Sequence, residues 1–255
     1  MMRALVAPLY GFLLAAPLIV VYYSFSPGVV LEFPPKEFTL TWYENLFERQ
    51  RLVQAIGVSV FVATFATAVA LIAGVPAAYA LTRGRFVGRH ALAALFLSPL
   101  VLPGLVLALG LLMAMSTLAP GLVGTVWPLL GAHGLITLPW VIRAVSASLE
   151  TADPHLEDAA RGLGATPLAA FFLVTLPAIR PGVTAAAAFA FIVSFGNFAL
   201  SMFFTSGTVT TLPVAIFEYI DQFQDPTVAA ASTLVIVGTA VLVGLTAPPR
   251  KMELP

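Results

Sequence analysis

The apolar residues of this chain lie in long, nearly unbroken runs, without the period of 2 or 3.6 that marks half-buried strands and amphipathic helices. A helix needs about 20 mostly apolar residues to cross the roughly 30 Å hydrocarbon layer of a bilayer. Six runs reach that length, and they predict transmembrane helices at about residues 4–25, 54–81, 91–115, 123–145, 183–205 and 228–246. We therefore expect an all-α polytopic membrane protein, with a single domain over residues 1–255.

Several prolines lie within these runs. Because proline lacks the backbone N–H of a helical residue and clashes with the preceding turn, each predicts a kink or a break. Neighbouring helices of a membrane bundle satisfy the carbonyl groups that are freed. The prolines are Pro17, Pro76, Pro99, Pro103, Pro128 and Pro139.

Composition agrees with the membrane interpretation. Hydrophobic residues make up 60% of the chain and charged residues only 9%, whereas soluble domains carry about 25% charged residues. The formal net charge is zero, so the overall electrostatics do not indicate a nucleic-acid partner. No cysteine is present, which excludes disulfide bonds, thiolate metal sites and cysteine nucleophiles.

The distribution of Lys and Arg predicts the orientation, since short cytoplasmic loops carry the excess of these residues. Nine of the twelve fall on one side of the predicted membrane, and they are Arg3, Arg83, Arg85, Arg89, Arg143, Arg161, Arg180, Arg250 and Lys251. The other three, Lys36, Arg49 and Arg51, lie in the first outside loop beside four glutamates. Both termini are therefore expected in the cytoplasm. The run over residues 4–25 is longer than the roughly 7–15 residues of a signal-peptide core, so we expect a retained first span.

The residues do not indicate catalysis or a cofactor. A phosphate-binding loop GxxxxGK[ST] needs a lysine after a glycine, and neither Lys36 nor Lys251 follows one. We expect no catalytic residue, no cofactor and no metal site in this chain. An ion-coupled secondary transporter is one alternative, although the span interiors hold only His133 where such proteins place ionisable groups. An intramembrane enzyme is a second, although no carboxylate pair, metal-ligand cluster or Ser/His dyad is placed for chemistry.

The loop over residues 146–182 differs in composition from the apolar runs around it. Asp153 is expected to cap a helix with Pro154 at its first position. Gly162 and Gly164 end that helix. Thr166 and Pro167 then begin a second helix by the same device, and it is expected to stop at the two prolines that precede the fifth span, Pro177 and Pro181.

The first of these two helices has contrasting faces. Leu156, Ala159, Ala160 and Leu163 share one face, and Glu157, Asp158 and Arg161 share the other. Small residues allow another backbone to approach closely, and adjacent charges fix the register of a docked surface. The alternative is an interfacial amphipathic loop that only connects two spans, and the pattern alone does not decide between them.

The residues of this loop resemble the EAA loop of binding-protein-dependent ABC importer permeases. The resemblance rests on Glu157-Asp158-Ala159-Ala160-Arg161-Gly162-Leu163-Gly164-Ala165, followed by Leu176-Pro177. It implies a type I ABC importer transmembrane-domain fold, and a coupling helix that inserts into a cleft on a separate ATPase. The usual Glu-Ala-Ala is spread over Glu157 to Ala160, so either acidic residue is a candidate for the contact. The coupling residues are expected to be Glu157, Asp158, Ala159, Ala160, Arg161, Gly162 and Gly164.

The resemblance also implies partners. They are two ATPase subunits that bind ATP and Mg²⁺, a second permease expected to be a paralogue in a heterodimer, and a periplasmic or lipid-anchored solute-binding protein. A bacterial inner-membrane location in contact with lipid follows. Segments such as Trp42-Tyr43-Glu44-Asn45 and Thr211-Leu212-Pro213 make the chain most similar to the second permease of spermidine/putrescine-type importers.

The fifth predicted span carries the candidate translocation path. Ser194, Asn197 and Ser201 recur at spacings of 3 and 4, hence on one helical face, with Phe198 beside them. In the similar permeases this span lines the path, which implies that Ser194, Asn197 and Ser201 line it, with Phe198 as a gate; helix packing is the alternative. Polyamine permeases often carry an acidic residue here, whereas this chain has Asn197. The solute is expected to be polyamine-like, and another amine, an amino acid, a phosphonate or an inorganic anion stays open.

Overall fold

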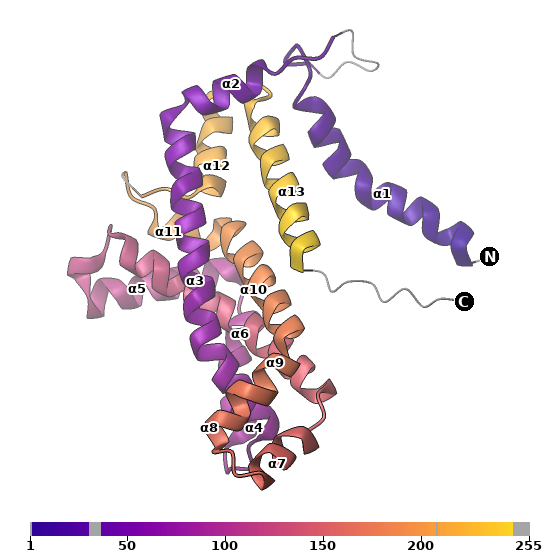
Figure 1. Cartoon of the computed structure of the whole chain (residues 1–255). Helices are drawn as coiled ribbons and strands as arrows, with labels where there is room; N and C mark the ends of the chain where they lie inside the picture. The colour runs from indigo at the N-terminus through magenta and orange to yellow at the C-terminus, as the bar shows by residue number, and fades with distance from the viewer. Residues whose placement is uncertain (1, 31–36, 208, 247–255) are drawn as a thin grey trace. The chain divides into compact units, whose positions relative to one another are not determined.

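The computed structural model describes residues 2–30, 37–207 and 209–246, with side chains from Pro8 onward. These residues are helical apart from turns, loops and one isolated β-bridge between Ser206 and Val209. Figure 1 shows the helices, which fall into two compact units: one is made by the described residues within 1–58 and 210–242, and the other by those within 59–209 and 243–246. The charged residues Lys36, Arg250 and Lys251, and the side chain of Arg3, lie outside the described part.

The first unit joins the beginning of the chain to a segment near its end. Its helices are α1 (Met2–Tyr23), α2 (Thr41–Glu48), the first turns of α3 (Gln50–Arg83), α12 (Leu212–Gln222) and most of α13 (Thr227–Thr246). A buried apolar cluster holds α2, α3, α12 and α13 together, and its members are Leu46, Leu52, Ala55, Ala215, Tyr219 and Ala231. Burial of these side chains is what pairs residues more than 150 positions apart.

The segment that leaves α1 is tied to α2 by side chains. The indole of Trp42 donates to the Ser26 carbonyl at 2.6 Å, and the hydroxyls of Ser24 and Tyr43 lie 2.8 Å apart. The ring of Tyr43 also packs against Phe25, with 5.4 Å between centroids. These contacts fix where the chain enters α2, and through it the start of α3.

The second unit contains the middle of the chain. Its helices are the rest of α3, α4 (Arg89–Leu97), η1 (Ser98–Leu100), α5 (Gly104–Leu118), η2 (Pro120–Leu122), α6 (Val126–Thr151), α7 (His155–Gly162), α8 (Pro167–Ala170), η3 (Phe171–Thr175), α9 (Leu176–Ala178), α10 (Arg180–Phe195) and α11 (Phe198–Phe204). Its core is an apolar cluster from α3, α6 and α10. Helices α6 and α10 pack along each other, and Gly182 permits this because a Cβ there would collide with the Ser148 side chain.

Two of the expected spans are interrupted. The third, expected at 91–115, consists of residues 89–100 and helix α5, which bend by 103° around the segment that ends at Pro103. The fifth, expected at 183–205, ends as α10 at Phe195 and resumes as α11 at Phe198. Pro17, Pro76 and Pro139 lie inside unbroken helices instead. Proline therefore marked only the first of these breaks.

By length and composition, three of the described helices are able to cross a membrane: α3, α6 and α13. Counting each bent pair as one span, 89–118 and 167–195, raises the number to five. The described part of α1, Pro8–Tyr23, is apolar but shorter. The chain is thus an all-helical membrane protein with three to five candidate spans among its described residues.

Candidate functional site

The loop between α6 and α10 folds as the capping residues predict, with one shift at its start. The Asp153 carboxylate accepts a hydrogen bond from the backbone N–H of His155 at 2.9 Å, and Pro154 takes the cap position one residue later than expected. The Asp153 side chain still satisfies a free N–H of the first turn, which is the physical role of a cap. Helix α7 begins at His155 as a result.

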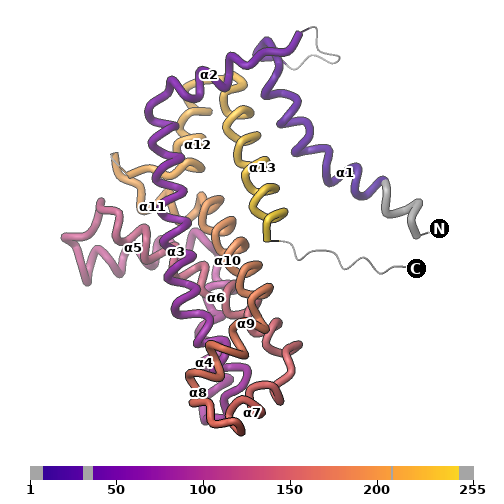
Figure 2. Tube along the Cα trace, in the orientation of Figure 1, coloured from indigo at the N-terminus to yellow at the C-terminus, as the bar shows by residue number. Residues whose placement is uncertain are grey.

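Glycine ends α7 in a Schellman motif. The N–H of Ala165 bonds to the carbonyl of Ala160, and the N–H of Gly164 bonds to that of Arg161. Gly164 adopts a φ of +94°, which favours glycine. The Thr166 hydroxyl then accepts from the N–H of Ala169 at 3.2 Å and caps the next helical run. Figure 2 follows the trace through this turn from α7 into α8.

The second helical run is longer than expected. Helix α8 continues through η3, a π-helical turn, into α9, so Pro177 lies inside the run instead of stopping it. The run ends at Ala178, and Arg180 starts α10 after a bend of 73°. Pro181 lies in the first turn of α10, where a missing N–H costs nothing.

Glu157 points into the second unit. Its carboxylate accepts hydrogen bonds from the Tyr79 hydroxyl of α3 at 2.5 Å and from the Thr175 hydroxyl of η3 at 2.7 Å. Tyr79 is in turn held edge-on against the ring of Phe171, with centroids 5.1 Å apart. One half-buried carboxylate thus joins α7 to a long membrane helix and to the π-helical turn. The sequence pattern left Glu157 and Asp158 as equivalent candidates. In the structure Glu157 makes internal hydrogen bonds, whereas Asp158 is exposed.

The remaining coupling candidates lie on or near the surface. Asp158, Ala159, Arg161, Gly162 and Gly164 are exposed, and Ala160 is half-buried. The two leucines of the apolar face are exposed as well, Leu156 to 53% and Leu163 to 92%. Helix α7 therefore turns most of its apolar and small residues outward, with Asp158 and Arg161 beside them, whereas the Glu157 carboxylate makes internal hydrogen bonds.

Arg83 also shapes this site, although in the sequence it served only to predict the orientation in the membrane. Its guanidinium donates to the carbonyls of Leu149 at 2.8 Å and Ala152 at 2.6 Å, which caps the end of α6. A cation at a helix C-terminus satisfies carbonyls that lack helical partners and interacts favourably with the dipole. The last turn of α3 thus fixes the end of α6 close to where α7 begins. The position of this arginine in the last turn of a long helix was the sequence signal that could have indicated a capping role.

The four path candidates lie at the break in the fifth span. The ring of His133, 1% exposed in α6, bonds through Nδ1 to the Ser194 hydroxyl at 2.8 Å and through Nε2 to that of Ser201 at 3.2 Å. Both serines are buried. The Asn197 side chain accepts from the N–H of Leu200 at 2.9 Å and caps α11, and Phe198 starts that helix half-buried. One imidazole therefore bridges the two sides of the break.

The described residues contain no group of three or more His, Cys, Asp or Glu side chains placed to hold a metal ion. The polar groups found at the α7 and α11 sites make helix caps and connections between helices. His133 brings two serine hydroxyls within hydrogen-bond distance of one imidazole, a Ser/His pairing that the sequence did not reveal. The ring and both serines are buried.

Comparison with known sequences gives a consistent result. Residues 70–247 match the family described as binding-protein-dependent transport system inner membrane component. The putrescine transport system permease protein PotI of Escherichia coli (strain K12) is 32% identical over 246 residues, covering 93% of this chain and 86% of PotI. The spermidine/putrescine transport system permease protein PotC of Haemophilus influenzae is 32% identical over 210 residues, covering 82% and 81%. The molybdenum transport system permease protein ModB of Mycobacterium bovis is 34% identical over 206 residues, covering 75% and 76%.

Solved structures share the fold. A chain of a bacterial ABC transporter involved in the import of the acidic polysaccharide alginate matches with a TM-score of 0.74 and 16% identity, covering 99% of this chain and 95% of that one. A chain of the MetNI methionine ABC transporter, in an inward-facing conformation, matches with a TM-score of 0.58 and 22% identity, covering 76% and 90%.

Proposed function

Because this chain belongs to the family of binding-protein-dependent transport system inner membrane components, we propose that it forms part of the path for a small polar solute and is driven through residues 146–182. The chain is a multi-pass permease subunit of a bacterial ABC importer and is not itself the ATPase. An ion-coupled transporter and an intramembrane enzyme are thereby set aside. The energy comes from ATP and Mg²⁺ held by a separate subunit.

The observation that carries the driving role is the Glu157 connection. Its carboxylate binds Tyr79 of α3 and Thr175 of η3, while the opposite side of α7 is exposed. Movement of α7 is therefore transmitted to α3, a 34-residue membrane helix, through the hydrogen bond between Glu157 and Tyr79. A hydrogen bond to a charged acceptor is about twice as strong as one between neutral groups. In this proposal Glu157 positions the coupling helix, and Asp158 takes the acidic contact with the ATPase.

The docking face consists of exposed residues of α7. Ala159, Gly162 and Gly164 allow the ATPase backbone to approach, Ala160 lies at the edge, and Asp158 with Arg161 sets the register. Leu156 and Leu163 add apolar area whose burial on docking is favourable. An exposed apolar face flanked by charges is typical of a surface that a partner covers.

Charge reversal at the docking face tests this proposal. Asp158→Lys should weaken binding of the ATPase subunit roughly tenfold, because it puts a cation where the partner meets an anion. The affinity is measured between detergent-solubilised permease and purified ATPase. Asp221→Lys makes the same change at an exposed residue of α12, on the proposed outer side, and should bind like the parent. Equal affinities of the Asp158 variant and the parent would reject the docking face.

We further propose six spans with both termini in the cytoplasm. The support is the distribution of Lys and Arg, together with a first helix, α1, whose described part is apolar. In this orientation the α6–α10 loop meets the ATPase, and the residues around Arg49 and Arg51 face outward. The assembly comprises two ATPases, a second permease expected to be a paralogue, and a periplasmic or lipid-anchored binding protein, within membrane lipid.

For the translocation path, we propose that Asn197 and Phe198 line it at the break in the fifth span, with Ser194 and Ser201 behind them. Support comes from the half-buried position of Asn197 and Phe198 and from the full burial of the two serines under His133. Helix breaks in membrane proteins lie where protein or a water-filled cavity satisfies the backbone. The serines then hold the shape of the break, and the two residues that follow Gly196 meet the solute.

Asn197 caps helix α11 and, in this proposal, also contacts the solute. Two variants separate these two roles. Asn197→Leu loses both and should lower the uptake rate without changing ATPase assembly. Asn197→Asp keeps the cap and adds a negative charge, which should raise the apparent affinity for a cationic solute. Uptake of labelled putrescine into proteoliposomes is the measurement. Parental uptake in both variants would return Asn197 to a purely structural role.

The solute is proposed to be a polyamine or a related small amine, because PotI and PotC are named for putrescine and spermidine. The similarity to ModB favours an inorganic anion as the second candidate. Calorimetric titration of the purified binding protein with putrescine and with molybdate distinguishes them. Binding of molybdate alone would overturn the polyamine proposal and leave the importer assignment in place.

A further inference from the structure

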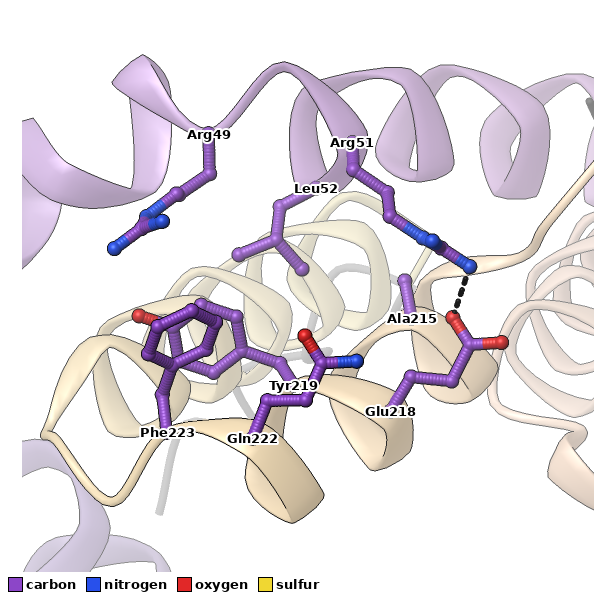
Figure 3. A pocket seen from close by; sticks show the side chains of 8 residues that line it. All are labelled: Arg49, Arg51, Leu52, Ala215, Glu218, Tyr219, Gln222 and Phe223. Atoms are coloured by element: carbon purple, nitrogen blue, oxygen red, sulfur yellow. Dashed lines mark hydrogen bonds and ion pairs between the residues drawn. The ribbon is translucent and has the colours of Figure 1, made fainter. Parts of the chain in front are cut away.

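A pocket of about 240 Å³ lies in the first unit, between the start of α3 and α12 (Figure 3). It takes no part in the coupling or path sites. Its lining residues are Arg49, Arg51, Leu52, Ala215, Glu218, Tyr219, Gln222 and Phe223. In the proposed orientation both segments lie outside the membrane, so the pocket opens on the outer face of the importer.

The floor of the pocket is apolar and its rim is charged. Leu52, Ala215 and Tyr219 are buried and belong to the core of the first unit, so the floor is rigid. The Tyr219 hydroxyl donates to the Asp225 carboxylate at 2.9 Å. Burial raises the pKa of Tyr219, and the hydrogen bond and charge of Asp225 act in the same direction. The phenol therefore stays neutral and adds no charge to the pocket.

The two arginines at the rim differ in the groups that their guanidinium contacts. The guanidinium of Arg51 pairs with the Glu218 carboxylate at 2.5 Å, so its charge is balanced. The guanidinium of Arg49 lies over two aromatic rings, 4.7 Å from the centroid of Phe223 and 5.8 Å from that of Tyr219. Within the described part of the chain, no carboxylate is within ion-pair distance of Arg49. Among the charged lining residues, Arg51 and Glu218 balance each other, and the Arg49 guanidinium has no ion pair with a described residue.

Arg49 is held in place before any partner arrives. It is the single residue between α2 and α3, where its N–H bonds to Asn45 and its carbonyl accepts from Leu52 and Val53. The rings of Tyr219 and Phe223 pack on each other at 4.8 Å and present a surface on which the planar guanidinium rests. A cation fixed in this way loses little freedom on binding, and its planar fork matches a carboxylate.

We propose that this pocket receives an acidic side chain, Asp or Glu, of the solute-binding protein when that protein docks on the outer face. The carboxylate would bind Arg49 beside the Arg51–Glu218 pair, and its methylene groups would cover the apolar floor. The Arg49 guanidinium repels a cation, so a polyamine is a poorer occupant of the position beside Arg49 than a carboxylate. This proposal rests on the proposed function and orientation.

The test measures binding of the importer's own solute-binding protein to the full complex in nanodiscs. Arg49→Glu should weaken that binding roughly tenfold or more, because it places two carboxylates together. Arg49→Lys keeps the charge and loses the planar fork, so it should weaken binding less. The parental affinity should fall as salt increases, and that of Arg49→Glu should depend less on salt.

Basal ATPase activity without binding protein separates this proposal from the proposed function, and every Arg49 variant should keep it. Arg85→Glu, a reversal at an exposed arginine on the proposed cytoplasmic side, serves as the matched control and should bind like the parent. Parental affinity in both Arg49 variants would overturn the proposal. So would altered putrescine uptake with unchanged affinity for the binding protein, since the pocket would then act on the solute. If Arg49→Glu does not assemble, Arg49→Lys decides on the same readouts.

Discussion

Replacement of Glu157 by alanine is expected to remove most ATP-driven uptake while the permease still inserts and assembles. The carboxylate is the shared acceptor for Tyr79 and Thr175, and hydrogen bonds to a charged group contribute about 1.5–3 kcal/mol each. Losing both frees α7 from α3 and η3, so we expect at least a roughly tenfold loss of uptake. Uptake into proteoliposomes and ATPase stimulation by loaded binding protein are measured together, and stimulation should fall along with uptake.

Variants that remove single contacts sharpen this result. Tyr79→Phe and Thr175→Val each delete one hydroxyl donor and should each lose part of the activity. Glu157→Gln keeps one acceptor oxygen and should be intermediate. Glu150→Ala removes an exposed glutamate from α6 and should behave like the parent. Full uptake by Glu157→Ala would mean that the connection does not transmit force.

Replacement of His133 by leucine is expected to cost about 3 kcal/mol of stability. The imidazole is buried and bonds to Ser194 and Ser201 on either side of the break in the fifth span. Removing one partner of a buried polar group costs about 1–3 kcal/mol, and leucine does not restore either bond. The measurement is the loss of the folded peak on size exclusion after heating in detergent, which should occur at a lower temperature.

An exposed histidine supplies the control for this prediction. His90→Leu in α4 makes the same chemical change at the surface and should lose its folded peak at the same temperature as the parent. Ser194→Ala removes only one of the two contacts and should fall between them. If His133→Leu melts with the parent, the imidazole does not hold the break together.

Local signals predicted the coupling loop well. Asp153, Gly164 and Thr166 act within one or two turns of their own position, so capping chemistry and backbone conformation are encoded where they occur. Long-range partners were beyond such reasoning. Tyr79 lies 78 residues before Glu157, and no local sequence pattern around either residue indicates that the two are in contact. The sequence therefore identified α7 but not which of its carboxylates faces inward.

The break in the fifth span shows the same limit. Ser194 and Ser201 were placed on one face by assuming a continuous helix, and Gly196 with Asn197 interrupts it. The two serines are nevertheless brought together, because His133 of α6 bonds to both. Helical periodicity thus grouped two serines that do lie together, but through a continuous helix that is not present. No proline marks this break, and a cap by Asn197 was the signal available.

The exposed face of α7 is proposed to contact the ATPase, and a cross-link tests this contact most directly. The chain has no cysteine, so Leu163→Cys, at a side chain 92% exposed, introduces a unique thiol. A benzophenone maleimide attached to this thiol should, on irradiation, join it to the ATPase subunit in the assembled importer, whereas the same label on Val30→Cys, in the proposed outer loop, should give no such product. Absence of the Leu163 cross-link in an assembled, active complex would contradict the account.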